Sequence, residues 1–256
     1  MNYDFRQQEI ELWNQSQRIY GIAYVPETDH ARVPLVICSH GLGESHHSNL
    51  EYAEQFARHG IAAYCFDFRG GGGSRSEGST TEMSVMTEVS DLETVLESAR
   101  KWDFVNHEKI VLFGASQGGI VSAITAARHA EDVGGLVLLY PAFLVHDAVH
   151  DVFQSLEEVP DQFSFMWITA GRPYVEDMWD YDVYAEIGHY QKRVLLLHGS
   201  RDSIVPISYS EQAAAVYEAA EYYVIEGAGH GFYGNAFEEA KQHIFRYLQK
   251  MDILQP

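Results

Sequence analysis

The motif that most constrains this chain is a serine flanked by glycines, placed between a strand pattern and a helix pattern. The hexapeptide GASQGG (residues 114–119) follows the apolar run Ile110–Phe113 and precedes the small-residue helical stretch Ile120–Arg128. A serine at a sharp strand-to-helix turn has an exposed hydroxyl and a strained backbone, and only small neighbours fit beside it. The motif therefore predicts Ser116 as a nucleophile at such a turn.

The rest of the chain alternates between strand and helix patterns. Strand patterns run over Ile10–Trp13, Arg18–Val25, Val33–Ser39, Ile61–Phe68, Lys109–Phe113, Gly135–Tyr140, Arg193–His198 and Tyr222–Ile225, and helix patterns over Tyr52–Arg58, Glu82–Trp102, Ile120–Arg128, Ser210–Ala220 and Phe237–Met251. The first two strands are expected to start the sheet in antiparallel fashion. Near-continuous apolar strands that alternate with helices indicate a mostly parallel sheet covered on both faces.

The alternation is interrupted once, by an aromatic and acidic segment. At 256 residues the chain suits one α/β domain with room for an insertion. We predict a core formed by residues 1–142 and 192–256 and a cap or lid formed by residues 143–191. An insertion of this length between two strands is typical of a functional segment or a small subdomain.

A serine nucleophile needs a histidine base and a carboxylate that orients it. Asp202 follows the strand Arg193–His198, and His230 follows the strand Tyr222–Ile225. Both lie at carboxyl ends of strands, where α/β sheets gather their sites, and the chain order is serine, acid, histidine. Asp202 alone would be a turn residue and His230 one of 13 histidines, but their joint placement predicts a triad with Ser116.

Acyl transfer also needs two N–H groups directed at the oxyanion of the tetrahedral intermediate. We expect one from Gln117, directly after the nucleophile. The other is expected from Leu42, in the His40–Gly43 loop that follows a strand. The alternative interpretation of this loop is a plain turn that ends the strand.

Composition argues against several other classes of function. A formal net charge of −20 would repel phosphate backbones and anionic membranes, so neither nucleic acid nor a membrane is an expected partner. No signal-like or spanning segment is evident, which favours the cytoplasm. Cys38 and Cys65 are expected to be free and buried. His46, His47 and Glu44 match no metal motif and are interpreted as surface residues that open a helix, so we expect no metal and no cofactor.

With these residues placed, the chain from about Ile19 to Leu248 resembles the α/β-hydrolase superfamily, and within it the bacterial feruloyl or cinnamoyl esterases. The resemblance rests on the His40–Gly43 loop, called the oxyanion loop below, on the motif Phe66-Asp67-Phe68, on residues 114–119 and on the two loops that carry Asp202 and His230. It implies the α/β-hydrolase fold and an insertion that caps the pocket and holds an aromatic acyl group.

The resemblance also implies two residues that bind the substrate. By matching to the family, Tyr174 would contact the phenolic end of a hydroxycinnamate, and Asp147 would have a similar task. The aromatic residues of the insertion could equally form its own core. One departure concerns Gly70–Gly72, which stand where the family has Gly-His-Gly, in a loop expected near the rim of the active site.

The leading hypothesis is a serine esterase that cleaves small aromatic esters through an acyl-enzyme. The alternatives are a general short-chain carboxylesterase, a serine aminopeptidase or acylpeptide hydrolase, and a receptor of the same fold without turnover. An aminopeptidase would need acids for the substrate's α-amine, which Glu176, Asp177, Asp180 and Asp182 could supply. The expected partner is a small-molecule ester; the oligomeric state stays open, although a homodimer is common in such families.

Overall fold

An eight-stranded sheet forms the centre of the computed structural model, which describes residues 2–73 and 75–254. In spatial order its strands are β1 (Phe5–Glu9), β4 (Gly21–Pro26), β6 (Ala62–Phe66), β5 (Val33–Ser39), β7 (Val105–Ala115), β8 (Gly135–Leu139), β11 (Val194–Gly199) and β12 (Ala220–Ile225). The pairs β1–β4 and β4–β6 are antiparallel, and the pairs from β6 to β12 are parallel. The mostly parallel sheet expected from the sequence is confirmed.

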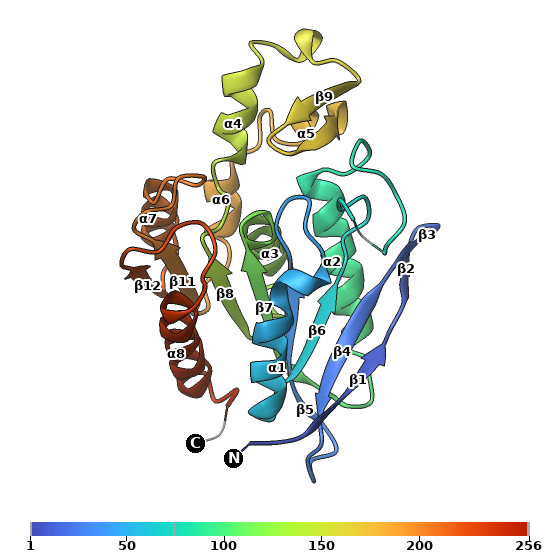
Figure 1. The fold of residues 1–256 in the computed structure, drawn as a ribbon, viewed down its shortest axis with the longest axis vertical. Coiled ribbons are helices and arrows are strands. Elements are labelled where there is room, and N and C mark those ends of the chain that lie inside the picture. The colour runs from blue at the N-terminus through green and yellow to red at the C-terminus, as the bar shows by residue number, and fades with distance from the viewer. Residues whose placement is uncertain (1, 74, 255–256) are drawn as a thin grey trace.

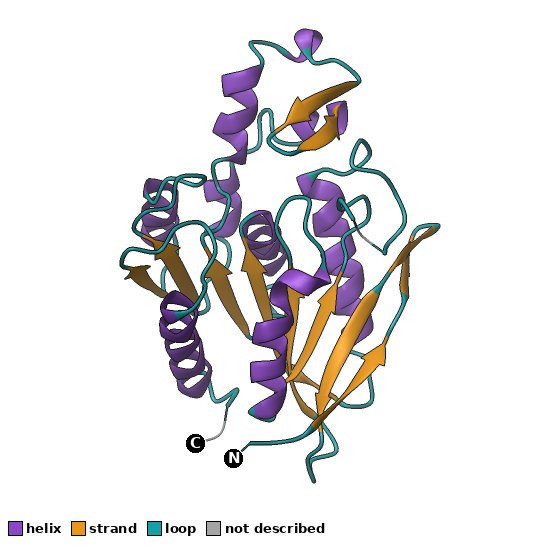
Figure 2. Cartoon of the chain, in the orientation of Figure 1, coloured by secondary structure: helices purple, strands orange, loops and turns teal. Residues whose placement is uncertain are grey.

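Helices cover both faces of this sheet, as Figures 1 and 2 show. Helices α1 (Leu50–Arg58) and α8 (Asn235–Lys250) pack on one face, and α2 (Val85–Ala99), α3 (Gln117–Arg128), α6 (Val183–Ile187) and α7 (Ser208–Val216) on the other. Strand β5 shows why both faces are apolar, because Leu35 and Ile37 join one buried cluster while Val36 and Cys38 join the other. Successive side chains of a strand point to opposite faces, so a strand buried on both sides reads as continuously apolar.

The antiparallel start of the sheet differs from the prediction. Its edge strand is Phe5–Glu9, which pairs with β4, whereas Leu12–Asn14 (β2) and Gln17–Ile19 (β3) form a separate hairpin. The assignment of Ile10–Trp13 to the sheet was therefore wrong. The sequence of β1, FRQQE, is mostly exposed, so this edge strand carries no apolar alternation that a pattern could detect.

The inserted segment lies beyond the carboxyl ends of the parallel strands. It contains α4 (Val145–Val152), a short 3-10 turn (Leu156–Glu158), the hairpin β9 (Gln162–Phe165) and β10 (Ile168–Gly171), α5 (Arg172–Glu176) and α6. In Figure 1, α4, β9 and α5 stand above the sheet. The rings of Phe153 and Phe163 lie 5.0 Å apart, as do those of Phe165 and Tyr174, so these four aromatic residues pack in pairs within the segment.

Cys38 and Cys65 are free and buried in adjacent strands, as expected. Within residues 2–73 and 75–254, none of the helices combines the length and the apolar character that a bilayer span requires.

Candidate active site

Ser116 occupies the strained turn that the sequence predicts. It separates the last residue of β7 from the first residue of α3 and has φ 53° and ψ −120°, a conformation that costs a non-glycine residue about 1–3 kcal/mol. Hydrogen bonds to the surrounding backbone stabilise this conformation, because the Ser116 N–H donates to Leu139 O at 3.0 Å and the Ser116 carbonyl accepts from Ala142 N at 2.9 Å. A Cβ on Gly114 would lie 2.1 Å from Gly118 O, and one on Gly118 would lie 2.3 Å from Ser39 O. The two glycines are therefore required by close backbone contact.

The three residues of the predicted triad lie in one hydrogen-bonded line. His230 Nδ1 lies 2.8 Å from Asp202 Oδ2, and His230 Nε2 lies 2.9 Å from Ser116 Oγ. Because the Asp202 carboxylate accepts at Nδ1, the neutral imidazole carries its proton there and Nε2 accepts from the serine hydroxyl. This tautomer places a base at the nucleophile.

The side chain of Asp202 is buried, and its carboxylate accepts from several hydrogen-bond donors. Burial alone would raise the pKa of this carboxyl group, but donation from His198, from His230 and from the backbone of Val205 and Ile204 outweighs it and holds the pKa well below its ordinary value. The two backbone N–H groups reach Asp202 Oδ1 at 2.9 Å each. The acid therefore stays ionised opposite His230.

His198 is a site residue that the sequence analysis missed. Its Nε2 faces two acceptors, Val205 O at 2.9 Å and Asp202 Oδ2 at 3.2 Å, so it carries the proton. Its Nδ1 then accepts from the Ser210 hydroxyl at 2.7 Å. The available signal was a polar residue at the end of an apolar strand pattern, two residues before the turn that leads to the acid.

The two residues chosen for the oxyanion hole flank Ser116. Gln117 is the first residue of α3, so its backbone N–H has no partner inside the helix. Leu42 lies in the turn after β5 and lines the same pocket as Ser116 and Gln117. The structure thus brings the three residues together; donation to an oxyanion stays a prediction.

The loop that carries Leu42 is fixed by the buried His40 ring. Nε2 of His40 accepts from Phe68 N at 3.1 Å, and Nδ1 donates to Gly41 O at 2.8 Å. Burial lowers the pKa of His40, which favours the neutral ring that this pair of bonds requires. At the far side of the turn, Trp167 Nε1 donates to Leu42 O at 2.8 Å, so the hairpin of the inserted segment contacts the oxyanion loop directly.

A buried polar chain lies behind the nucleophile. The Tyr174 hydroxyl donates to Gln117 Oε1 at 2.6 Å, and Gln117 Nε2 donates to Glu88 Oε2 at 2.9 Å. Glu88 is 1% exposed, and burial raises the pKa of its carboxyl group well above the ordinary value of 4.5. Helix α2, the nucleophile turn and the inserted segment are thereby connected through a carboxyl group whose neutral form is favoured by burial.

An apolar cavity of about 30 Å³ opens beside Ser116. Side chains from the oxyanion loop, the nucleophile turn, the inserted segment and the Asp202 loop surround it: Leu42, Ser116, Gln117, Ala142, Leu144, Val145, Ala148, Phe165, Met166, Trp167, Tyr174, Ile204 and Val205. None of these side chains is charged. The space holds about two water molecules, so a larger group enters only when the lining side chains move outward.

The two predicted substrate-binding residues differ in their placement. Tyr174 is 1% exposed and lines the apolar cavity. Asp147 is an exposed residue of α4 whose carboxylate accepts from Tyr209 Oη at 2.6 Å and faces His146 Nδ1 at 2.9 Å. These bonds, the one from Tyr209 first, lower the pKa of Asp147. It lies outside the cavity lining, and its contact with substrate stays a prediction.

The residues considered and rejected as metal ligands have other partners. His46 begins a short 3-10 turn, as expected for a helix start, but it is 3% exposed, so its placement on the surface was wrong. In this buried position two of its polar atoms have a partner, because Asp67 Oδ1 accepts both from His46 N at 2.6 Å and from His46 Nδ1 at 2.7 Å. Over the described part of the chain, no three histidine, cysteine or acidic side chains come together as a metal site.

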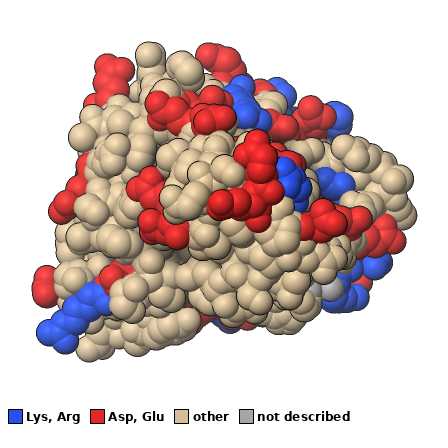
Figure 3. All heavy atoms as spheres, turned by 90° about the horizontal axis from the view of Figure 1, so that it is seen from above, with Lys and Arg blue, Asp and Glu red and all other residues tan. Residues whose placement is uncertain are grey.

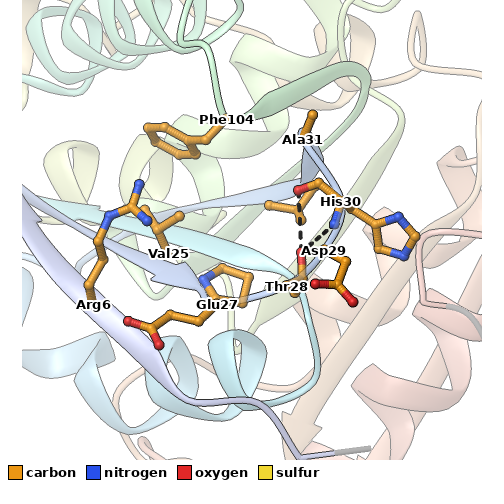
Figure 4. A pocket seen from close by; sticks show the side chains of 10 residues that line it. Arg6, Val25, Glu27, Thr28, Asp29, His30, Ala31 and Phe104 are labelled. Atoms are coloured by element: carbon orange, nitrogen blue, oxygen red, sulfur yellow. Dashed lines mark hydrogen bonds between the residues drawn. The ribbon is translucent and has the colours of Figure 1, made fainter.

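A second hollow lies at the opposite end of the sheet. Figure 4 shows it against Arg6, Val25 and Phe104, with the loop Glu27–Ala31 along one side. Thr28 Oγ1 accepts from His30 N at 3.2 Å, which closes this loop on itself. The hollow adjoins the start of β5, whereas the oxyanion loop follows its end, so it belongs to a different edge of the sheet from Ser116.

The fold and the serine–histidine–aspartate arrangement define an α/β-hydrolase, and comparison with family models agrees. The model described as serine aminopeptidase, S33 matches residues 30–172, and one described as TAP-like protein matches residues 171–253. The first covers more than half of the chain, which therefore belongs to this hydrolase family.

Two curated relatives are 28% and 32% identical to this chain and match it over only part of their own length. An uncharacterized protein of Mycobacterium tuberculosis is 28% identical over 81% of this chain and 66% of its own length. The monoacylglycerol lipase of Mycolicibacterium smegmatis is 32% identical over 56% of this chain and 49% of its own. The chain thus spans about two thirds or less of the length of these relatives.

Solved structures share the fold over nearly the whole chain. Est1E from Butyrivibrio proteoclasticus, in a structure with bound ferulic acid, has a TM-score of 0.86 at 21% identity and covers 95% of this chain and 99% of its own. The α/β hydrolase GrgF from Penicillium sp. sh18 has a TM-score of 0.78 at 15% identity, with 96% and 98% covered. At these identities the likeness shows the α/β-hydrolase fold.

Proposed function

We propose that this chain is a serine carboxylic-ester hydrolase that works through an acyl-enzyme and prefers small aromatic esters of the feruloyl or cinnamoyl type. The observation that carries the proposal is the unbroken hydrogen-bonded line from Asp202 through His230 to Ser116, next to an uncharged apolar cavity. A hydroxyl with a base at 2.9 Å is an activated nucleophile.

In the proposed reaction the Ser116 oxygen attacks the ester carbonyl while His230 Nε2 takes the hydroxyl proton. Asp202 stabilises the imidazolium that results, and the N–H groups of Leu42 and Gln117 hold the oxyanion. Collapse of the intermediate breaks the bond to the alcohol oxygen, which receives the proton from His230. Water then attacks the acyl-enzyme with the same base and releases the acid.

The cavity supports an apolar acyl group. Phe165 and Tyr174 offer aromatic faces, and the lining provides no partner for a charge. Since about 30 Å³ is too small for a phenyl ring, the exposed tip of the hairpin, Met166 and Trp167, would have to move outward. The bound ferulic acid of the Est1E structure supports the aromatic preference by analogy of fold.

An aminopeptidase is the second candidate, because the family model carries that description. The acids that would hold an α-ammonium group are engaged elsewhere. Glu176 pairs with Arg172 at 2.6 Å, Asp182 accepts from the N–H of Ala185 at the start of α6, and Asp177 accepts from the Ser84 hydroxyl. Glu176, Asp177, Asp180 and Asp182 all lie outside the cavity lining. The site therefore favours a neutral acyl group.

Steady-state turnover of three substrates tests the proposal: methyl ferulate, p-nitrophenyl butyrate and alanine p-nitroanilide. We expect the highest kcat/KM for the ferulate and loss of turnover in Ser116→Ala. Cleavage of the butyrate alone would reduce the proposal to a general carboxylesterase, and cleavage of the anilide alone would replace it with a peptidase. Ala148→Phe, which fills the cavity from α4, should impair ferulate hydrolysis far more than acetate ester hydrolysis.

A further inference from the structure

Glu44 borders the nucleophile on a side that the apolar cavity does not occupy. A Cβ placed on Gly41 would lie 3.1 Å from Glu44 Oε2 and 3.3 Å from Ser116 Cβ, so both side chains flank the same glycine. Gly41 N donates to Glu44 Oε2 at 3.1 Å, which holds the carboxylate over the loop. Glu44 is exposed and does not line the apolar cavity.

Aromatic side chains continue this second side. The ring of Tyr140 meets the ring of His230 edge-on at 4.7 Å and that of Phe232 at 4.9 Å. A Cβ on Gly231, which follows His230, would lie 2.8 Å from the ring of Tyr233, and this ring is 81% exposed although a large aromatic side chain gains from burial. Burial and then the charge of Glu44 raise the pKa of the Tyr140 hydroxyl, and Tyr233 contributes as well. Glu44 thus lies beside the loop next to Ser116, and the rings of Tyr140 and Tyr233 lie beside His230 and the residue that follows it.

The mechanism assigns this region to the alcohol half of an ester. His230 Nε2 delivers its proton to the leaving oxygen, so the alcohol has to lie against the histidine ring. The acyl group then occupies the apolar cavity, whose lining does not include His230. The two halves of the substrate therefore meet different chemistry.

We propose that Glu44, Tyr140 and Tyr233 form a subsite for a cationic alcohol, such as one that carries a quaternary ammonium group. The inference rests on the proposed esterase function and extends it to the leaving group. A carboxylate beside aromatic rings is the combination that binds ammonium groups by charge and by cation–π attraction. A sugar alcohol would require several donors and acceptors, and this subsite offers one carboxylate and two hydroxyls.

The charge distribution of the whole molecule favours the same ligand. The formal net charge is −20, and in Figure 3 acidic side chains dominate over basic ones on the face seen from above. A negative field raises the local concentration of cations and speeds their association. A cationic ester would therefore be attracted to the molecule before it reaches the site.

Two esters of equal shape test the subsite: butyrylcholine and 3,3-dimethylbutyl butyrate, in which carbon replaces the charged nitrogen. Their binding to Ser116→Ala is measured by calorimetry at low salt, so the result does not depend on turnover. We expect butyrylcholine to bind at least about fivefold more tightly. Adding Glu44→Gln should bring the two affinities close together, whereas the control Glu97→Gln, an exposed acid of α2, should keep the preference.

Equal binding of the two esters to Ser116→Ala would overturn the inference, as would a preference that survives Glu44→Gln. Because each ratio is taken within one variant, a general disturbance of the loop does not alter it. Turnover of p-nitrophenyl butyrate by the unmodified enzyme reports separately on the esterase function. Turnover without a preference for the cation would reject the subsite alone, and preferential binding without turnover would reject the esterase alone.

Discussion

Replacing Glu88 with Gln is expected to stabilise the protein, by an amount that grows as the pH rises. The carboxyl group is buried and its pKa in the folded state is raised well above 4.5. Between these two pKa values the folded chain binds more protons than the unfolded chain, so the contribution of Glu88 to stability is present at low pH and is lost as the pH rises. The amide of Gln does not titrate, and its oxygen still accepts from Gln117.

The size of the effect follows from proton linkage. In the window above pH 4.5 and below the folded pKa, one group changes the free energy of unfolding by about 1.4 kcal/mol per pH unit. From pH 5.5 to 7.5 the advantage of Glu88→Gln should therefore grow by up to about 2.7 kcal/mol. The reasoning would be refuted by a difference that is constant over this range.

Urea denaturation at four pH values measures this difference directly, provided that the dependence on urea concentration is the same for both proteins. Glu97→Gln is the matched control, since Glu97 lies on the same helix and is exposed. It should show no comparable growth with pH.

Three further predictions concern the site. Asp202→Asn should lower kcat about 10⁴-fold with the fold intact, because the histidine loses the acceptor that sets its tautomer; a loss below tenfold in ester turnover assays would contradict this. His198→Phe removes one hydrogen-bond donor from Asp202 and leaves more negative charge opposite His230. The low-pH limb of the plot of kcat/KM against pH should therefore move to higher pH. If this limb does not move, the role of His198 is purely structural. Tyr174→Phe should lower the free energy of unfolding by about 1 kcal/mol, because its buried hydrogen bond to Gln117 is lost. An unchanged midpoint of urea denaturation would argue against that bond.

The central features of the site could be predicted because local chemistry marks them. Ser116 needs glycines on both sides, and this requirement is written in the sequence as a motif. Asp202 and His230 follow strands of one sheet in a set order, so their meeting follows from topology. Parallel strands of one sheet end at the same edge, so residues that are far apart in the chain meet there.

Other features depend on tertiary contacts that no local pattern reveals. His198 has its role only because the loop that carries Asp202 folds back over its ring. Glu88 did leave a signal, since it lies at helical spacing among Val85, Val89 and Leu92 on the apolar face of α2. The edge strand β1 left none, because four of its five residues are exposed and polar and its pairing with β4 needs no apolar alternation.

The central claim is that Ser116 carries the acyl group during turnover. The direct measurement is mass spectrometry of the enzyme after acid quench during steady-state hydrolysis of methyl ferulate, followed by peptide mapping. The account predicts a feruloyl adduct on the peptide that contains Ser116, and neither adduct nor turnover in Ser116→Ala. Hydrolysis that persists in Ser116→Ala, or an adduct on another residue that turns over at the steady-state rate, would contradict it.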